Sequence, residues 1–111
     1  MPFVEKRKPH YDLKKIKSLL CSEESREVTR ISREGAVALG YMDEEEMLAV
    51  IDSLTQRHFY KSMTTQHDTT LWQDVYKISD EPESKIYIKL QLSPDNEKAI
   101  IIQFKRDSEE D

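Results

Sequence analysis

The chain has 111 residues, a formal net charge of -5 and one cysteine. This length suits one domain with a single hydrophobic core, and the lone Cys21 excludes an internal disulfide and is typical of a reducing compartment. Since no apolar run approaches the roughly 18 residues of a spanning helix, we expect no membrane segment, no secretory signal and a cytoplasmic location.

The first nine residues contain two prolines and the basic cluster Lys6-Arg7-Lys8. They predict a mobile basic arm in front of the first helix. Asp12 is a typical N-cap residue. The apolar residues that follow it have the three- and four-residue spacing of a helix, and they are Leu13, Ile16, Leu19 and Leu20.

Two further helices are predicted before the spacing changes. One runs from about Thr29 or Ser32 to Leu39 and ends at Gly40, a residue that favours the end of a helix. Asp43 begins the other, with three glutamates in its first turn, where carboxylates suit the positive end of the helix dipole. Its predicted buried stripe is Met47, Leu48, Val50, Ile51 and Leu54.

From His58 onward the spacing of apolar residues falls to two. We predict strands at about 58–65, 70–78, 84–92 and 98–106, joined by short turns. Short connections between successive strands favour an antiparallel meander. The predicted fold is α+β, with three N-terminal helices packed on one face of a four-stranded antiparallel sheet. The 111 residues then form one domain, from the arm at 1–9 to an acidic tail at 107–111.

The alternation of side chains predicts which residues face away from the helices. In the last two strands Tyr87, Lys89, Gln103 and Lys105 alternate with aliphatic residues and should lie on the open face. If Lys61 and Gln73 share that face, Trp72 and Asp74 turn inward. We therefore expect Trp72 in the core and Asp74 hydrogen-bonded near a turn or a helix end.

The polar residues of this sheet suit cleavage of RNA without a metal. Lysines can stabilise the charge that builds on a phosphate attacked by the neighbouring 2′-oxygen, and Gln73 can position phosphate or base. Tyr87 offers a ring for stacking and a hydroxyl for proton transfer. His67, in the predicted turn, is a candidate base or substrate contact, or an ordinary exposed residue. No zinc-ligand spacing and no glycine-rich phosphate loop is present, so no metal or cofactor is expected.

Taken alone, these residues predict only a sheet that faces nucleic acid. Tyr60 could equally be a packed sheet aromatic, and Lys105 a solvated cation at the end of a strand. The negative net charge opposes indiscriminate binding to a polyanion. It favours an alternative, a non-catalytic module of the same fold that binds RNA or protein.

Four segments resemble a known family: FYKSMTT at 59–65, HDTTLWQDVY at 67–76, IYIKL at 86–90 and IIQFKR at 101–106. They closely resemble the MqsR toxins (motility quorum-sensing regulators) of bacterial type II toxin–antitoxin systems. The resemblance implies a RelE-like mRNA interferase that cleaves single-stranded mRNA without the ribosome, at GCU-type sites.

The resemblance also implies roles for particular residues. By position, catalytic roles fall on Lys61, Gln73 and Tyr87, and substrate contacts on Tyr60 and Lys105. A cognate antitoxin with a zinc-binding part and a helix-turn-helix DNA-binding part is implied as partner. The chain alone is therefore not expected to bind DNA.

Overall fold

The structure is a computed structural model, which describes residues 4–65, 67–68, 70–81 and 84–107. The described residues form three α-helices, α1 (Leu13–Leu20), α2 (Arg30–Ala38) and α3 (Glu44–Asp52). They also form six strands: β1 (Glu5–Lys6), β2 (Arg26–Val28), β3 (Phe59–Thr64), β4 (Trp72–Glu81), β5 (Ser84–Leu92) and β6 (Ala99–Arg106). In this part of the chain no helix is long and apolar enough to cross a bilayer.

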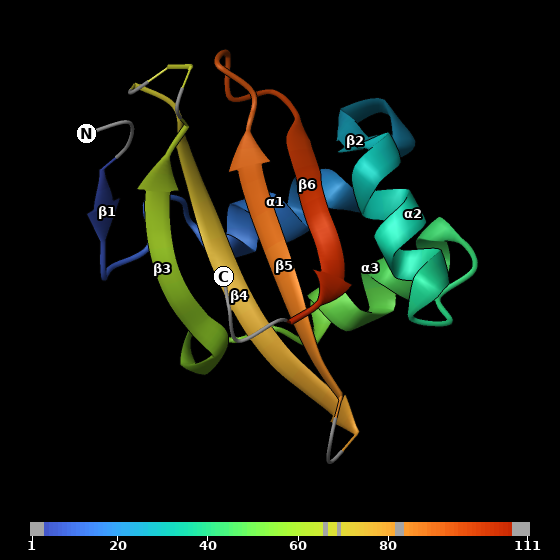
Figure 1. The fold of residues 1–111 in the computed structure, drawn as a ribbon. Helices are drawn as coiled ribbons and strands as arrows, with labels where there is room; N and C mark the ends of the chain where they lie inside the picture. Colours follow the sequence, from blue (N-terminus) through green and yellow to red (C-terminus); the bar gives the residue numbers. More distant parts are fainter. Residues whose placement is uncertain (1–3, 66, 69, 82–83, 108–111) are drawn as a thin grey trace.

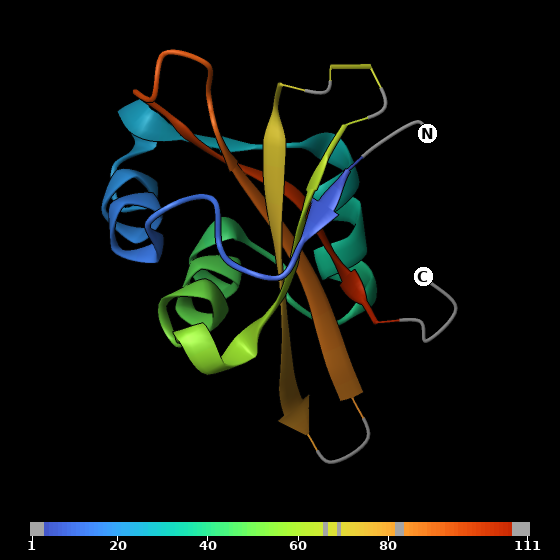
Figure 2. The ribbon, with the colours of Figure 1, turned by 90° about the vertical axis from the view of Figure 1, so that its left-hand side faces the viewer.

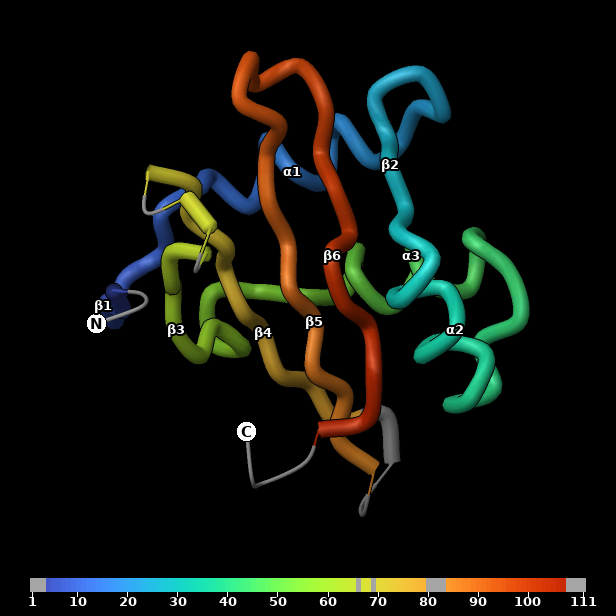
Figure 3. The backbone as a smooth tube through the Cα atoms, turned by 45° about the horizontal axis from the view of Figure 1, so that its top comes forward, coloured from blue at the N-terminus to red at the C-terminus, as the bar shows by residue number. Residues whose placement is uncertain are grey.

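The strands make one mixed sheet in the order β1-β3-β4-β5-β6-β2 (Figure 1). Its centre, β3 to β6, is the antiparallel meander expected from the period-two spacing. At opposite edges, β1 pairs antiparallel with β3 and β2 pairs parallel with β6 (Figure 3). The prediction of a four-stranded antiparallel sheet is therefore wrong. Strands of two and three residues are too short to leave a period-two pattern in the sequence.

The sequence predicted that the three helices pack on one face of the sheet, and this prediction is wrong. α1 and α3 cover one face, whereas α2 lies beside β6 at the edge (Figures 1 and 2). β2 pairs with residues 99–101 of β6, and α2 packs beside a later part of that strand, where Gly35 approaches the backbone of Phe104. A helix beside an edge strand protects backbone groups that would otherwise be open to another chain.

α1 and α3 begin at the residues expected from the sequence, Asp12 and Asp43. Asp12 accepts a hydrogen bond from the backbone N–H of Lys14 at 2.9 Å, and Asp43 accepts one from Glu46 at 2.9 Å. Thr29 caps α2 in the same way. Each cap satisfies an N–H group that the helix itself leaves unpaired. The buried residues of α1 and α3 then pack against the inner face of the sheet, through Leu13, Ile16, Leu20, Met47, Ile51, Ile86, Ile88, Leu90, Ile101 and Phe104.

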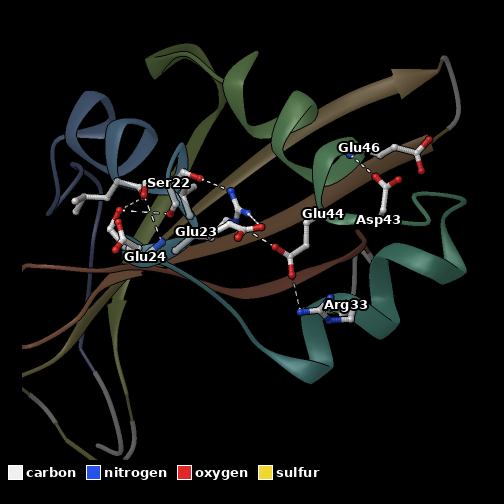
Figure 4. A network of polar contacts seen from close by, with 11 residues as sticks. Ser22, Glu23, Glu24, Arg33, Asp43, Glu44 and Glu46 are labelled. Carbon is white, nitrogen blue, oxygen red and sulfur yellow. Dashed lines mark hydrogen bonds and ion pairs between the residues drawn. The ribbon is translucent and has the colours of Figure 1, made fainter.

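An ion-pair network joins β2 to α2 and α3 on the side away from the open face (Figure 4). The Glu44 carboxylate accepts from Nε of Arg26 at 3.0 Å and from an Nη of Arg33 at 2.7 Å. Arg26 is 11% exposed at its side chain and also donates to the backbone oxygen of Leu20. With every charge partnered by an opposite charge or a carbonyl, this network holds the three elements together.

Replacing Gly35 with alanine is expected to destabilise the protein, although alanine is normally the better helix residue. An added Cβ would overlap the backbone oxygen of Phe104 and lie 3.3 Å from Cβ of Lys105. We expect the free energy of unfolding to fall by about 1–3 kcal/mol, measured by urea denaturation. The control, Glu34→Ala on the exposed side of α2, should change it by no more than about 0.5 kcal/mol. A Gly35→Ala protein as stable as wild type would show that α2 can move away from β6.

Candidate nucleic-acid interface

The open face is the face of β3 to β6 opposite α1 and α3, and it points toward the viewer in Figure 1. Directly paired residues of neighbouring strands lie on the same face. One row of pairs across the sheet joins Lys61, Val75, Lys89 and Gln103, and the next joins Lys77, Tyr87 and Lys105. The open face therefore gathers four lysines around a tyrosine and glutamines.

The structure places Lys61, Gln73 and Tyr87 on this one face. They do not form a tight cluster. Gln73 precedes Lys77, the partner of Tyr87, by four residues of β4, which is about 14 Å along the strand. Lys61 lies between them, opposite Val75. An extended nucleotide chain could reach all three, but a single phosphate could not.

Tyr60 lies at an irregularity of β3, where the pairing register shifts between Phe59 and Lys61. An extra residue at such a point redirects side chains. The Tyr60 ring lies near three cations: its centroid is 3.9 Å from Nζ of Lys77 and 5.6 Å from both Nζ of Lys61 and Cζ of Arg7. The quadrupole of an aromatic ring attracts each cation that lies over its face. Tyr60 is thus a half-buried aromatic in a positively charged setting.

Lys61 is paired with a carboxylate. Its Nζ lies 2.7 Å from Oε2 of Glu5, and the Lys61 side chain is 15% exposed. Glu5 belongs to β1, which pairs with β3, and the N–H of Val4 also donates to Oγ1 of Thr64. Part of the segment expected to be a mobile arm thus forms a strand that brings an acid to the candidate catalytic lysine.

Tyr87 is buried, with 6% of its surface exposed. Nζ of Lys105 lies 5.0 Å from its ring centroid, and Nζ of Lys89 lies 5.9 Å away. Lys105 thus lies beside Tyr87, and its contact with substrate stays a prediction. Little of Tyr87 is therefore available for a base to stack on in this conformation.

Gln73 is held by a second glutamine that we did not single out from the sequence. Its Nε2 donates to Oε1 of Gln91 at 2.9 Å. Because that bond uses the amino side of the amide, the carbonyl oxygen of Gln73 is directed elsewhere and can accept from a substrate. Gln91 lies two residues beyond Lys89 and four beyond Tyr87 in β5, so it shares their face, and that spacing was the signal that could have found it.

His67 lies apart from the lysine rows. It is an exposed residue in the connection between β3 and β4, beyond the Gln73 end of β4. The structure therefore brings His67 nearer to Gln73 than to Tyr87. A role for His67 as substrate contact stays a prediction.

Asp74 is fully buried, and its carboxylate accepts hydrogen bonds from residues just before α1 and from β3. It accepts from the backbone N–H of His10 at 3.0 Å and of Tyr11 at 2.9 Å, and from Oγ of Ser62 at 2.6 Å. The predicted hydrogen bonding of Asp74 near a helix start is confirmed. The predicted core position of Trp72 is wrong. Trp72 is half-buried, with its ring stacked on that of His10 at 5.3 Å.

His10 should titrate below its ordinary range. Burial of its ring lowers its pKa from 6.5, the charge of Lys6 lowers it further, and Asp74 offsets part of the shift. Because protonation is disfavoured in the folded state, the neutral form contributes stability above pH 6.5 that is lost as the pH falls through the folded pKa. In an NMR titration the His10 midpoint should lie below 6.5 and rise in Lys6→Gln. A midpoint unaffected by Lys6→Gln would contradict the contact between Lys6 and His10.

Two comparisons with known proteins show the family to which the chain belongs. Residues 8–106 match the family described as "Motility quorum-sensing regulator, toxin of MqsA". The chain belongs to this MqsR toxin family. It is also 38% identical over 105 residues to the mRNA interferase toxin MqsR of Escherichia coli (strain K12), covering 92% of this chain and 98% of that protein. The expected membership of the MqsR family is confirmed, and the region matched contains every candidate site residue.

Two residues of the interface were not assigned to it from the sequence. Lys77 and Arg7 approach Tyr60, whereas Lys89, which approaches Tyr87, was expected on the open face. The alternation of β4 places Lys77 on the open face, so that signal was present. Arg7 had no such signal, because its position depends on the pairing of β1 with β3.

Proposed function

We propose that the chain is a ribosome-independent endoribonuclease that cleaves single-stranded mRNA. The observation that carries the proposal is the open face, where Lys61, Gln73 and Tyr87 lie on adjacent strands among further lysines. Membership of a toxin family, and the name of the E. coli relative, an mRNA interferase, support the same activity.

The proposed reaction begins with attack of a ribose 2′-oxygen on the adjacent phosphorus. The 2′-oxygen loses its proton, the bond to the 5′-oxygen breaks, and that leaving oxygen takes up a proton. Lys61 and Lys105 stabilise the negative charge on the non-bridging oxygens. The Tyr87 hydroxyl transfers a proton in this step.

Gln73 has a different part in this proposal. It lies about 14 Å from Tyr87 along the sheet, so it positions a neighbouring nucleotide while the reaction occurs near Lys61 and Tyr87. Its hydrogen bond to Gln91 fixes which end of the amide meets the RNA. In this proposal Tyr60 and His67 contact flanking nucleotides.

The test is cleavage of a single-stranded RNA by the purified, antitoxin-free protein in the presence of a metal chelator. We expect cleavage to persist and to leave a 2′,3′-cyclic phosphate on one product and a 5′-hydroxyl on the other. End mapping of the products then gives the sequence preference. An RNA that remains intact under these conditions would overturn the proposal.

The family description names MqsA as the protein that this kind of toxin accompanies. We propose that the chain is inhibited by a cognate antitoxin with a zinc-binding part that binds the toxin and a helix-turn-helix part that binds DNA, and that it acts in the cytoplasm on mRNA. The chain by itself would leave DNA unbound. Growth arrest on induced expression, relieved by co-expression of the antitoxin, is the expected result in cells.

The second candidate function is a non-catalytic module that binds RNA or protein. Two observations favour it: the net charge of -5, and the ion pair that occupies Lys61. RNA bound without any cleavage would support this alternative.

A further inference from the structure

Lys77 is a cation inside the open face to which the proposed mechanism gives no role. Its Nζ lies 3.9 Å from the ring centroid of Tyr60 and 3.3 Å from Oδ1 of Asp107. It pairs directly with Tyr87 across β4 and β5. Lys77 is thus flanked by the two tyrosines of the proposed site.

The two chain ends each bring a carboxylate to a lysine of the open face. Glu5, in β1, lies 2.7 Å from Nζ of Lys61, and Asp107, directly after β6, lies 3.3 Å from Nζ of Lys77. Carboxylate and phosphate oxygens are both acceptors that pair with an ammonium group. Two points of this face therefore already bind an anionic oxygen.

The Asp107 carboxylate is poorly satisfied where it lies. Its side chain is 4% exposed, and apart from the contact with Lys77 its Oδ1 receives no hydrogen bond from the residues that the structure describes. A buried charge with incomplete partners costs free energy. A phosphate that replaced it would free Asp107 to return to water, so this contact is suited to exchange.

The spacing of the two lysines fits a nucleotide chain. Lys61 pairs with Val75, and Lys77 lies two residues further along β4. Their backbones are therefore about 8 Å apart, comparable to the distance between consecutive phosphates of an extended strand. Tyr60 contacts both lysines, as expected for a ring beside the base of the intervening nucleotide.

We propose that Lys77 binds a second phosphate of the RNA, next to the one at Lys61, and that Asp107 and Glu5 occupy these two phosphate positions while RNA is absent. The proposal rests on the proposed function for the identity of the ligand. RNA binding then exchanges two internal ion pairs for two phosphate contacts, and removing either carboxylate favours the bound state.

The test measures binding of a single-stranded RNA whose 2′-hydroxyls are methylated, so that internal attack cannot cleave it. Fluorescence anisotropy over a range of salt concentrations gives the affinity and its salt dependence. Lys77→Ala should weaken binding and reduce the slope of log K against log salt by about 0.7, the value for one phosphate contact on a single strand. Lys15→Ala, the same change on an exposed residue of α1, should leave the slope unchanged.

Asp107→Asn separates the exchange from a general charge effect. In the wild-type background it should tighten binding by about two- to fivefold, the contribution of one partly exposed ion pair. In the Lys77→Ala background it should have no effect. Equal tightening in both backgrounds, or none in either, would overturn the proposal, and Asp107→Ser provides a second measurement if the asparagine variant folds poorly.

The outcome is separable from that of the proposed function. Suppose that the wild-type protein leaves unmodified RNA intact but binds the methylated RNA in a way that depends on Lys77. The proposed nuclease activity would then be wrong, and the proposed phosphate site at Lys77 would stand. Cleavage with binding that does not depend on Lys77 would do the reverse.

Discussion

Replacement of Asp74 by alanine is expected to lower the free energy of unfolding by about 3–5 kcal/mol, because three donors lose their acceptor and each unsatisfied buried group costs about 1–3 kcal/mol. The side chain is fully buried and accepts from two backbone N–H groups, those of His10 and Tyr11, and from the Ser62 hydroxyl. Alanine would leave these donors without an acceptor inside the protein. Urea denaturation followed by circular dichroism measures the change.

Two further variants control this prediction. Asp74→Asn keeps one acceptor oxygen and should cost less, about 1–3 kcal/mol. Asp52→Ala removes an exposed carboxylate at the end of α3 and should stay within about 0.5 kcal/mol of wild type. An Asp74→Ala protein with wild-type stability would mean that water or another group satisfies these donors.

Tyr87→Phe is expected to reduce the rate of RNA cleavage by at least about a hundredfold, the lower end of the contribution of a positioned acid or base. The reason is the loss of the hydroxyl, since the ring itself is kept. The melting temperature should remain close to that of wild type. Single-turnover cleavage of a labelled RNA measures the rate.

Alanine at this position tests something else. Because Tyr87 is 6% exposed, Tyr87→Ala would leave a cavity and cost about 3–5 kcal/mol. Its loss of activity would therefore not distinguish a catalytic group from a structural one. A Tyr87→Phe protein that cleaves RNA at the wild-type rate would remove the hydroxyl from the mechanism.

The sequence was sufficient wherever local chemistry decides the structure. Asp12 and Asp43 cap their helices as expected, because a cap needs only neighbouring residues. The period-two spacing of β5 and β6 put Tyr87 and Lys105 on the open face for the same reason. The predicted bonding of buried Asp74 also held, since a buried carboxylate must find donors.

The features that could not be predicted from the sequence depend on contacts between residues far apart in the chain. β1 and β2 are strands only because β3 and β6 pair with them, and the position of α2 depends on the contact of Gly35 with Phe104. The ion pairs of Lys61 with Glu5 and of Lys77 with Asp107 join residues far apart in the chain. Trp72 was assigned to the core from the alternation of β4, and its ring is instead half-buried and stacked on that of His10.

Cleavage by Lys61→Ala, compared with Lys15→Ala at equal charge, is the most direct test of the open face as an active site. Lys61 lies between Gln73 and the row of Tyr87, whereas Lys15 is exposed on α1, across the sheet. We predict that Lys61→Ala lowers the single-turnover rate by about 100- to 1000-fold, the cost of losing one group that stabilises the transition-state charge, and that Lys15→Ala cleaves as wild type does. Equal rates for the two variants, with both proteins folded, would contradict the account.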